Sequence, residues 1–166
     1  MEDIVERLGY LALGTRLKRI GDKLQSQAQA VLDQEGFGLP ASHFPLLAAL
    51  ERLGALNVGE IAEALGVSQP GITRQLEKLE REGLVKSQRR SDDRRRRPIT
   101  LTVAGGLLVS RAKKSAWTHL EAAVAGICAG LQGSLLEQLT GLERELKVTP
   151  LAERVTRTPS RRHARA

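Results

Sequence analysis

Arginine is the residue type in this sequence with the clearest chemical use. Residues 88–100, QRRSDDRRRRPIT, contain six arginines and two aspartates, and apolar residues precede and follow them. Guanidinium groups bind phosphate and carboxylate oxygens through paired hydrogen bonds. The segment is therefore suited to a polyanion, of which nucleic acid is the leading candidate. Taken alone, however, a run of charge is more often a solvated loop in a basic protein.

The positive charge of the chain is concentrated in two places. The 166 residues carry a formal net charge of +7, of which residues 86–114 carry +8 and residues 151–166 carry +4, while all other residues together carry −5. This distribution predicts one internal basic patch and a basic, disordered tail over residues 150–166. The tail is expected to add only non-specific affinity for a polyanion.

The residues before the arginines predict two helices joined by a tight turn, a helix-turn-helix. Asn57 and Glu60 have the spacing of a capping box, and apolar residues follow at intervals typical of a helix: Val58, Ile61, Ala62 and Leu65. Gly66 then ends the first helix. Ser68 is placed to cap the second helix and Gly83 to end it. The buried stripe of the second helix is expected to consist of Ile72, Leu76 and Leu79.

The second helix would present a polar face on which DNA can be read. In a helix-turn-helix, the N-terminal part of the second helix enters the major groove. Six residues are therefore predicted to contact DNA: Ser68, Gln69, Pro70, Thr73, Arg74 and Lys78. Arginine can bind guanine, and glutamine can bind adenine, through two hydrogen bonds, whereas Lys78, further along the helix, would meet phosphate. An ordinary surface helix explains the polar face about equally well.

A β-hairpin is predicted around residues 84–102, directly after the second helix, with the arginines at its tip. Such a wing can reach the narrow minor groove, where the negative potential is highest. Because alternate residues of a hairpin point to opposite faces, Arg95 is predicted to enter the groove, and the carboxylate of Asp93 to orient a neighbouring arginine. The other three arginines of the run would meet phosphates or solvent: Arg94, Arg96 and Arg97.

These motifs together resemble the MarR family of winged helix-turn-helix regulators, over roughly residues 39–109. The resemblance rests on LPASHFPLLAALERLGALNVGEIAEALGVSQPGITRQLEKLEREGLV, followed by DDRRRRPITLTVAGGLL. Its most specific part is a wing pattern of Asp-x-Arg and then Leu-Thr, which falls on Asp93, Arg95, Leu101 and Thr102. Pro70 and Gly71 stand where the family more often has Ser and Thr, and this departure affects the expected base preference.

The resemblance implies a mainly α-helical fold with a small β-wing, in which a winged helix-turn-helix is flanked by N- and C-terminal dimerisation helices. One domain would span residues 1–149. Its dimerisation helices would lie in residues 1–34 and 103–149, and its winged helix-turn-helix in residues 41–101. The basic tail of residues 150–166 would follow.

Apolar stripes outside the helix-turn-helix favour pairing between helices. One helical stripe is expected to begin with Ile4, Leu8 and Leu11 and to continue to Val31. Thr102 is placed to cap a single long helix that starts at Val103.

Between residues 117 and 131, apolar residues repeat at intervals of 3, 4, 3 and 4, the heptad spacing that suits helix pairing. The predicted dimer interface comprises Leu8, Leu11, Trp117, Leu120, Val124, Ile127 and Leu131. Periodicity alone leaves burial within one monomer open, whereas the family resemblance implies that the terminal helices of two chains interlock.

Catalysis and metal binding have little support in the sequence. The three histidines, His43, His119 and His163, lie on separate segments without metal-ligand spacing. His43, at a helix start, is expected to be a surface or capping residue, and Cys128 a packed thiol rather than a redox sensor. No apolar run approaches the roughly 20 residues of a membrane span. The chain is therefore expected to need no cofactor or metal, to be no enzyme and to act away from membranes, and its single cysteine fits a reducing cytoplasm.

Two functions from different classes remain. The first is a sequence-specific transcriptional regulator that binds a palindromic operator in double-stranded DNA as a homodimer, and is expected to be a repressor released by a small-molecule effector. The second is a protein-interaction module, in which the winged helix docks a partner protein. The arginine-rich wing and the basic outward face of the second helix favour the first. By resemblance, an effector would bind between the dimerisation helices and the DNA-binding lobe.

Overall fold

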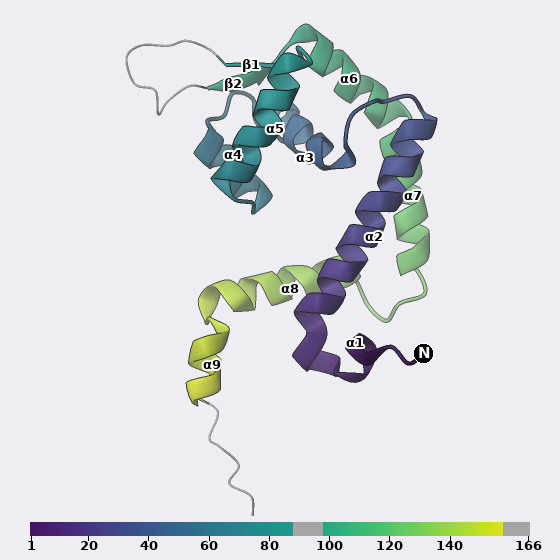
Figure 1. Cartoon of the computed structure of the whole chain (residues 1–166), viewed down its shortest axis with the longest axis vertical. Helices are drawn as coiled ribbons and strands as arrows, with labels where there is room; N and C mark the ends of the chain where they lie inside the picture. Colours follow the sequence, from purple (N-terminus) through teal and green to yellow (C-terminus); the bar gives the residue numbers. More distant parts are fainter. Residues whose placement is uncertain (88–97, 158–166) are drawn as a thin grey trace, which may run out of the picture. The chain divides into compact units, whose positions relative to one another are not determined.

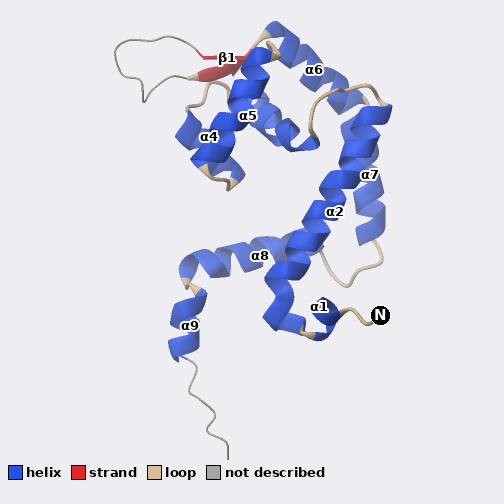
Figure 2. Ribbon diagram, in the orientation of Figure 1, coloured by secondary structure: helices blue, strands red, loops and turns tan. Residues whose placement is uncertain are grey.

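The computed structural model describes residues 1–87 and 98–157, which form helices and one small β-hairpin (Figures 1 and 2). It divides into two compact units, Met1–Glu121 and Ala122–Ala166, where the sequence predicted a single domain over residues 1–149. The first unit contains the helix-turn-helix and the hairpin.

The first unit begins with a broken helical segment. Helix α1 (Ile4–Arg7) is followed by a 3-10 turn (Gly9–Ala12) and then by the long helix α2 (Leu13–Gln34). Asp3 caps α1 by accepting hydrogen bonds from backbone N–H groups, and it also forms an ion pair with Arg19 of α2 at 2.7 Å. The apolar stripe expected to run through this segment is therefore interrupted before α2 begins.

The centre of the first unit consists of helices α3 (Phe44–Leu53), α4 (Val58–Leu65) and α5 (Gln69–Arg81), which lie next to the hairpin in Figure 1. In the hairpin, β1 (Val85–Ser87) pairs antiparallel with β2 (Ile99–Leu101). The core between these elements is apolar and includes Leu46, Leu47, Leu50, Ile61, Ile72, Leu79, Val85, Ile99 and Val109. The predicted helix-turn-helix followed by a two-stranded wing is thus confirmed.

Helix α6 (Val103–Lys114) is fixed directly to the base of the wing. Its N-cap Thr102 accepts a hydrogen bond from the Gly105 N–H at 3.1 Å, as the sequence predicted for this position. The Thr102 hydroxyl also donates to the Gly83 carbonyl at 2.6 Å, and its backbone N–H donates to the Leu84 carbonyl at 3.0 Å. Gly105 lies so close to the Leu84 carbonyl that a Cβ atom on it would be only 2.0 Å from that oxygen.

The single long helix expected to start at Val103 is wrong. The structure contains two helices, α6 and α7 (Ala116–Cys128), separated at Ser115, whose φ of −135° and ψ of −96° are not helical. Glu35, the C-cap residue of α2, contacts the helix that follows the break: its carboxylate lies 2.9 Å from His119 Nδ1. Hydrogen bonds from Ser115 and then from His119 lower the pKa of Glu35. Glu35, some eighty positions earlier in the chain, thus stabilises the break at Ser115. No local sequence pattern predicts this break.

The second unit is helical to the end of its described part. Helix α8 (Leu135–Val148) begins at its N-cap Ser134, and α9 (Leu151–Arg157) follows. The disordered tail predicted from residue 150 is therefore wrong for α9. Its Arg154 guanidinium donates to the backbone carbonyl and the carboxylate of Glu145, at 2.8 and 2.9 Å, which ties α9 to α8.

Candidate nucleic-acid interface

The turn between α4 and α5 sets the position of the second helix. The predicted capping box is present: the Glu60 N–H donates to Asn57 Oδ1 at 3.0 Å, and the Asn57 N–H donates to Glu60 Oε2 at 2.7 Å. Gly66 ends α4 with a φ of 64°, a left-handed conformation that costs glycine little. The Val67 N–H then donates to the Ala62 carbonyl at 3.0 Å, which closes the turn.

Helix α5 is held by the three side chains that its periodicity predicted. Ile72 and Leu79 are fully buried and Leu76 is nearly so. Ser68 is the N-cap residue, but its hydroxyl makes no capping hydrogen bond to the first turn, so the predicted role of that side chain is wrong. Pro70 fills a first-turn position, where a missing N–H costs nothing. The Ser68 hydroxyl is thus left outside the hydrogen bonding of the helix.

The opposite face of α5 is exposed. Five of the six residues predicted to contact DNA from this helix are on it: Ser68, Gln69, Pro70, Thr73 and Arg74. The Thr73 hydroxyl donates to the Gln69 carbonyl at 3.0 Å, and the Gln69 amide lies towards the start of α4, 3.6 Å from where a Cβ atom on Gly59 would be. Within residues 1–87 and 98–157, Arg74 forms no ion pair. Its guanidinium is consequently a cation on this face that is available to a ligand.

Lys78, the sixth predicted contact on α5, is half-buried and lies near His43. His43 is the N-cap residue of α3, but its side chain makes no capping hydrogen bond and only 7% of the residue is exposed, so the predicted surface position is wrong. His43 precedes Leu47 and Leu50 by four and seven residues, and it therefore lies on their buried face although a 3-10 turn, Ala41–His43, precedes α3. Lys78 therefore lies close enough to His43 for its charge to act on that side chain.

The burial of His43 predicts a dependence of stability on pH. Desolvation, and then the charge of Lys78, lower the pKa of His43 below its ordinary value of 6.5. Below about pH 6.5 the unfolded chain therefore binds more protons than the folded chain, and the free energy of unfolding should fall as the pH is lowered through that value. Urea unfolding at pH 7.5 and pH 5.5 measures this loss. His43→Gln should show a smaller loss than the parent, and equal losses in the parent and His43→Gln would contradict the prediction.

The tip of the wing lies outside the described residues, and so do its predicted contacts Asp93, Arg94, Arg95, Arg96 and Arg97. The strands that carry the tip are well fixed. Val85 pairs with Leu101, and Ile99 also exchanges backbone hydrogen bonds of 2.8 and 3.1 Å with Leu56, in the segment before α4. The base of the wing is thus joined to the helix-turn-helix by a third backbone segment.

Part of the internal basic patch serves the fold. The Arg111 guanidinium lies 4.1 Å from the centre of the Phe37 ring and donates to the Gly36 carbonyl at 3.1 Å. Lys113 forms an ion pair with Glu51 of α3. These two cations of α6 were counted with the wing arginines in the sequence, but the structure uses them to hold α6 against its neighbours.

The residues predicted for the dimer interface are found in different surroundings. Trp117 packs edge-to-face on Phe44, with ring centres 5.9 Å apart, so it belongs to the core of the first unit. Leu131 lies beyond the end of α7 at Cys128, so the predicted heptad does not continue along one helix. The other five residues are Leu8, Leu11, Leu120, Val124 and Ile127, of which all but the half-buried Leu120 are exposed. The exposed leucines at residues 8 and 11 and the exposed side of α7 are available to a second chain.

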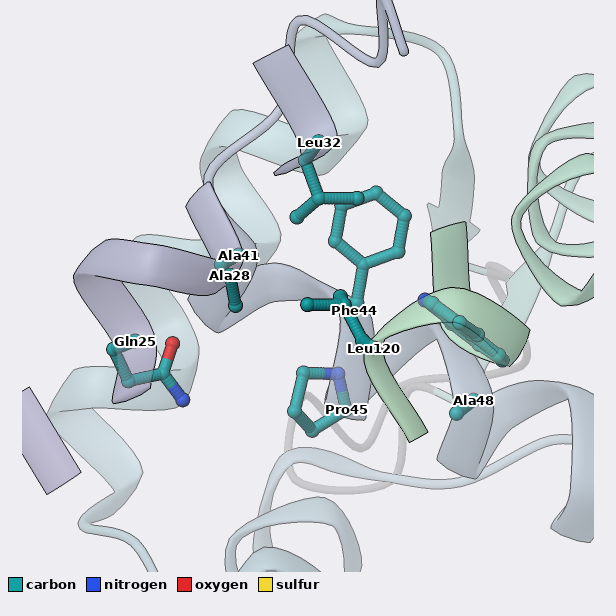
Figure 3. A pocket seen from close by; sticks show the side chains of 9 residues that line it. Gln25, Ala28, Leu32, Ala41, Phe44, Pro45, Ala48 and Leu120 are labelled. Atoms are coloured by element: carbon teal, nitrogen blue, oxygen red, sulfur yellow. The ribbon is translucent and has the colours of Figure 1, made fainter. Parts of the chain in front are cut away.

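A cavity of about 280 Å³ lies between α2, α3 and α7 (Figure 3). Nine residues line it: Gln25, Ala28, Leu32, Ala41, Phe44, Pro45, Ala48, Trp117 and Leu120. The lining is almost entirely apolar, and all nine residues belong to the first unit. Sequence reasoning did not find this cavity, because its walls come from three separate segments and carry no motif.

In the described part of the chain, no three His, Cys, Asp or Glu side chains come together in a way that would hold a metal ion. Across residues 1–87 and 98–157, no helix combines the length and the apolar character that crossing a lipid bilayer requires. Cys128, the one cysteine in the sequence, is half-buried at the end of α7.

Comparisons with known proteins agree with this geometry. A model of the MarR family matches residues 37–96. A mutant of Escherichia coli MarR in complex with operator DNA is 19% identical, with a TM-score of 0.68 over 90% of this chain and 100% of that chain. The transcriptional regulator BldR from Sulfolobus solfataricus is 25% identical, with a TM-score of 0.64 over 90% and 100% of the two chains. BpsR from Bordetella bronchiseptica is 21% identical, with a TM-score of 0.59 over 80% and 98%.

The structural matches show the fold: a mainly helical chain with a two-stranded wing, as predicted from the sequence. The family model covers α3, α4, α5 and the start of the wing, which are the elements that carry the exposed polar face. The chain therefore has the fold of the MarR-family structures that it matches, and its residues 37–96 match the model of that family.

Proposed function

We propose that this chain is a MarR-family regulator, a homodimeric repressor that binds a palindromic operator in double-stranded DNA. The observation that carries the proposal is the outward face of α5, where Arg74 is exposed and unpaired within the described residues while the opposite face is buried. A rigidly held helix with a free guanidinium fits major-groove reading, because paired hydrogen bonds to guanine need a fixed donor. The protein of E. coli to which the fold is similar was solved with operator DNA.

The chain reads DNA with two elements in this proposal. Helix α5 enters the major groove through Ser68, Pro70 and Arg74, with Gln69 and Thr73 beside them and Lys78 near the backbone. The wing follows the minor groove, where Arg95 is inserted and Asp93 orients a neighbouring arginine, while Arg94, Arg96 and Arg97 meet phosphates or solvent. Two copies related by a two-fold axis would then contact half-sites about 10 bp apart.

Release from DNA is assigned to a small-molecule effector that binds the cavity between α2, α3 and α7. A ligand there would contact α3, which packs against α4 and α6. The DNA binding of BpsR, whose fold this chain shares, is regulated by 6-hydroxynicotinic acid. Regulation of DNA binding by a small ligand is therefore compatible with this architecture.

Selection of bound sequences from a pool of random double-stranded DNA tests the proposal. We expect an imperfect palindrome with half-sites about 10 bp apart, bound at least about a thousandfold more tightly than scrambled DNA of the same length. If no sequence is enriched and binding depends only on salt concentration, the proposal is contradicted. The winged helix would then be assigned to docking a partner protein.

Arg74 provides the residue-level test on α5. Arg74→Ala should cost about 1–3 kcal/mol in operator binding, which is roughly a 5- to 150-fold loss of affinity, and should relax the preference for one base pair in each half-site. Arg81→Ala is the matched control on the same helix, since Arg81 Nε donates to the Glu77 carbonyl at 3.2 Å and lies at the C-terminal end. Its loss should be smaller and equal for operator and scrambled DNA, as for a phosphate contact. Equal effects of both substitutions in titrations at two salt concentrations would show that α5 supplies charge only.

A further inference from the structure

We propose that Arg111 of α6 is a positioning residue for operator binding, which orients the wing towards the minor groove without contacting DNA itself. The inference rests on the proposed function, because it takes the wing to follow the minor groove of an operator. Three observations carry it: the wing and α6 are joined as one body, the turn after α2 is fixed, and Arg111 connects the two. All the residues concerned belong to the first unit.

The wing and the start of α6 are joined without a flexible linker. Thr102 is the only residue between β2 and α6, and its backbone N–H donates to the Leu84 carbonyl at 3.0 Å. Gly105, in the first turn of α6, lies too close to the same carbonyl to carry a Cβ atom. A tilt of α6 would therefore move the base of the wing with it.

The turn after α2, residues 35–37, is a fixed point at the other end of α6. Figure 1 shows α6 running from the hairpin towards the C-terminal end of α2. The Phe37 N–H donates to the Leu32 carbonyl at 2.9 Å. The Phe37 ring is buried and packs edge-to-face on Phe44, with ring centres 5.7 Å apart. The Phe37 ring and the adjacent Gly36 carbonyl are thus held in place.

Arg111 connects α6 to this turn. Its guanidinium lies 4.1 Å from the centre of the Phe37 ring and donates to the Gly36 carbonyl at 3.1 Å. On the core side of α6, Val109 and Ala112 are fully buried. Arg111 lies about 200° around the helix from Val109, so the core contacts hold one side of α6 and Arg111 holds the opposite side. Because Arg111 is exposed, replacing it opens no cavity in the core.

The distance between Arg111 and the wing makes α6 a lever. Arg111 is nine residues after Thr102, which is about 14 Å along a helix axis. A small tilt at the Arg111 end is therefore carried to the wing strands at the other end. Contacts in the minor groove require a fixed orientation of the element that makes them. Loss of Arg111 should consequently weaken the contacts of the wing and spare those of α5.

A phosphate contact is the competing explanation for a cation at this place. The Arg111 guanidinium is already engaged with Phe37 and Gly36. Lys114, three positions further along α6, is exposed and has no ion pair in the part of the chain that the structure describes. Lys114→Gln is therefore the matched control, because it removes a charge from the same helix without touching the turn after α2.

Footprinting of the operator complex at saturating protein separates the two grooves. Arg111→Gln should keep the protection of guanine N7 from methylation in the major groove and lose the protection of minor-groove sugars from hydroxyl radicals. Arg111→Lys, which keeps a cation at the Phe37 ring, should retain most of the minor-groove protection. Lys114→Gln should leave both footprints unchanged. Equal loss of protection in both grooves, or equal footprints for Arg111→Gln and Lys114→Gln, would overturn the proposal.

Titration of the same variants distinguishes positioning from charge. For Arg111→Gln, operator affinity should fall roughly three- to tenfold, the range for one cation–ring contact with one hydrogen bond from a charged donor. The Lys113–Glu51 ion pair and the buried side of α6 remain and limit the loss. The slope of log affinity against log salt concentration should be unchanged. A slope smaller by about one, as for a lost phosphate contact, would overturn the proposal.

Hydrogen exchange of the full-length protein without DNA tests the connection independently of the proposed function. A tilt of the wing would strain the backbone hydrogen bonds of 2.8 and 3.1 Å between Ile99 and Leu56. In Arg111→Gln, the amides of these two residues should exchange roughly threefold faster or more, beyond any change at Leu76 of α5. Equal acceleration at all three amides, or none, would overturn the positioning role. Faster exchange in Arg111→Gln, when the parent protein protects neither groove of any DNA, would support the connection and contradict the proposed function.

Discussion

Replacing Gly105 by alanine should separate α6 from the wing and abolish operator binding. A Cβ atom on Gly105 would lie 2.0 Å from the Leu84 carbonyl oxygen and 3.0 Å from its carbon, and these backbone atoms cannot move aside as a flexible side chain would. The same carbonyl accepts the hydrogen bond from the Thr102 N–H at 3.0 Å, so relief of the clash breaks the joint between β1, β2 and α6. We expect a loss of about 3 kcal/mol or more in the free energy of unfolding, at the upper end for overpacking.

The neighbouring glycine is a matched control. Gly106 has no atom within 4 Å of an added Cβ and lies inside the same helix, so Gly106→Ala should stabilise the fold by about 0.5–1 kcal/mol through helix propensity. Thermal unfolding at one fixed protein concentration measures both, with an expected fall in Tm of roughly 6 °C or more for Gly105→Ala. Similar Tm values for the two variants would mean that α6 does not approach Leu84 as closely as described.

Replacing Val124 by aspartate should abolish dimer formation and operator binding together. Val124 lies on α7, is 39% exposed in the single chain and belongs to the apolar stripe predicted to pair with a second copy. In a two-fold symmetric interface the substitution occurs twice, and each buried, unpaired carboxylate costs several kcal/mol. Sedimentation equilibrium at micromolar protein should show a monomer, and the gel shift on operator DNA should be lost.

Ala122→Asp controls for the added charge. Ala122 is also exposed on α7 but lies on nearly the opposite side of the helix from Val124. The variant should remain a dimer and should bind the operator with affinity reduced only by the general effect of negative charge. A Val124→Asp protein that still sediments as a dimer would place the interface elsewhere, with the exposed residues Leu8 and Leu11 as the next candidates.

The helix-turn-helix itself was predictable because its determinants are close in the sequence. The capping box of Asn57 and Glu60, the left-handed Gly66 and the buried stripe of α5 each depend on residues within a few positions of one another. The wing strands and the cap at Thr102 followed for the same reason. The exposed face with Arg74 was therefore correctly placed from periodicity alone.

Features that depend on distant segments could not be predicted in this way. His43 is buried although it was expected at the surface. The charge of Lys78, which belongs to α5, acts on it. Arg111 belongs by sequence to the basic patch, yet it stacks on Phe37, and its partner Gly36 lies 75 residues away. The charge and spacing of a side chain show which interactions it can form. Its neighbours in the folded chain decide which of these interactions it does form.

The sequence by itself determined the type of domain, the face of α5 that is exposed and the position of the wing strands. The tertiary structure alone decided the break at Ser115, the close approach of Gly105 to Leu84 and the cavity. Local periodicity reflects interactions between residues three or four positions apart. Helix propensity and the burial of one helix face dominate these interactions. The break at Ser115 depends on Glu35, and the cavity depends on the packing of α2, α3 and α7. These segments are far apart in the sequence, and no local pattern in any of them shows that they lie together.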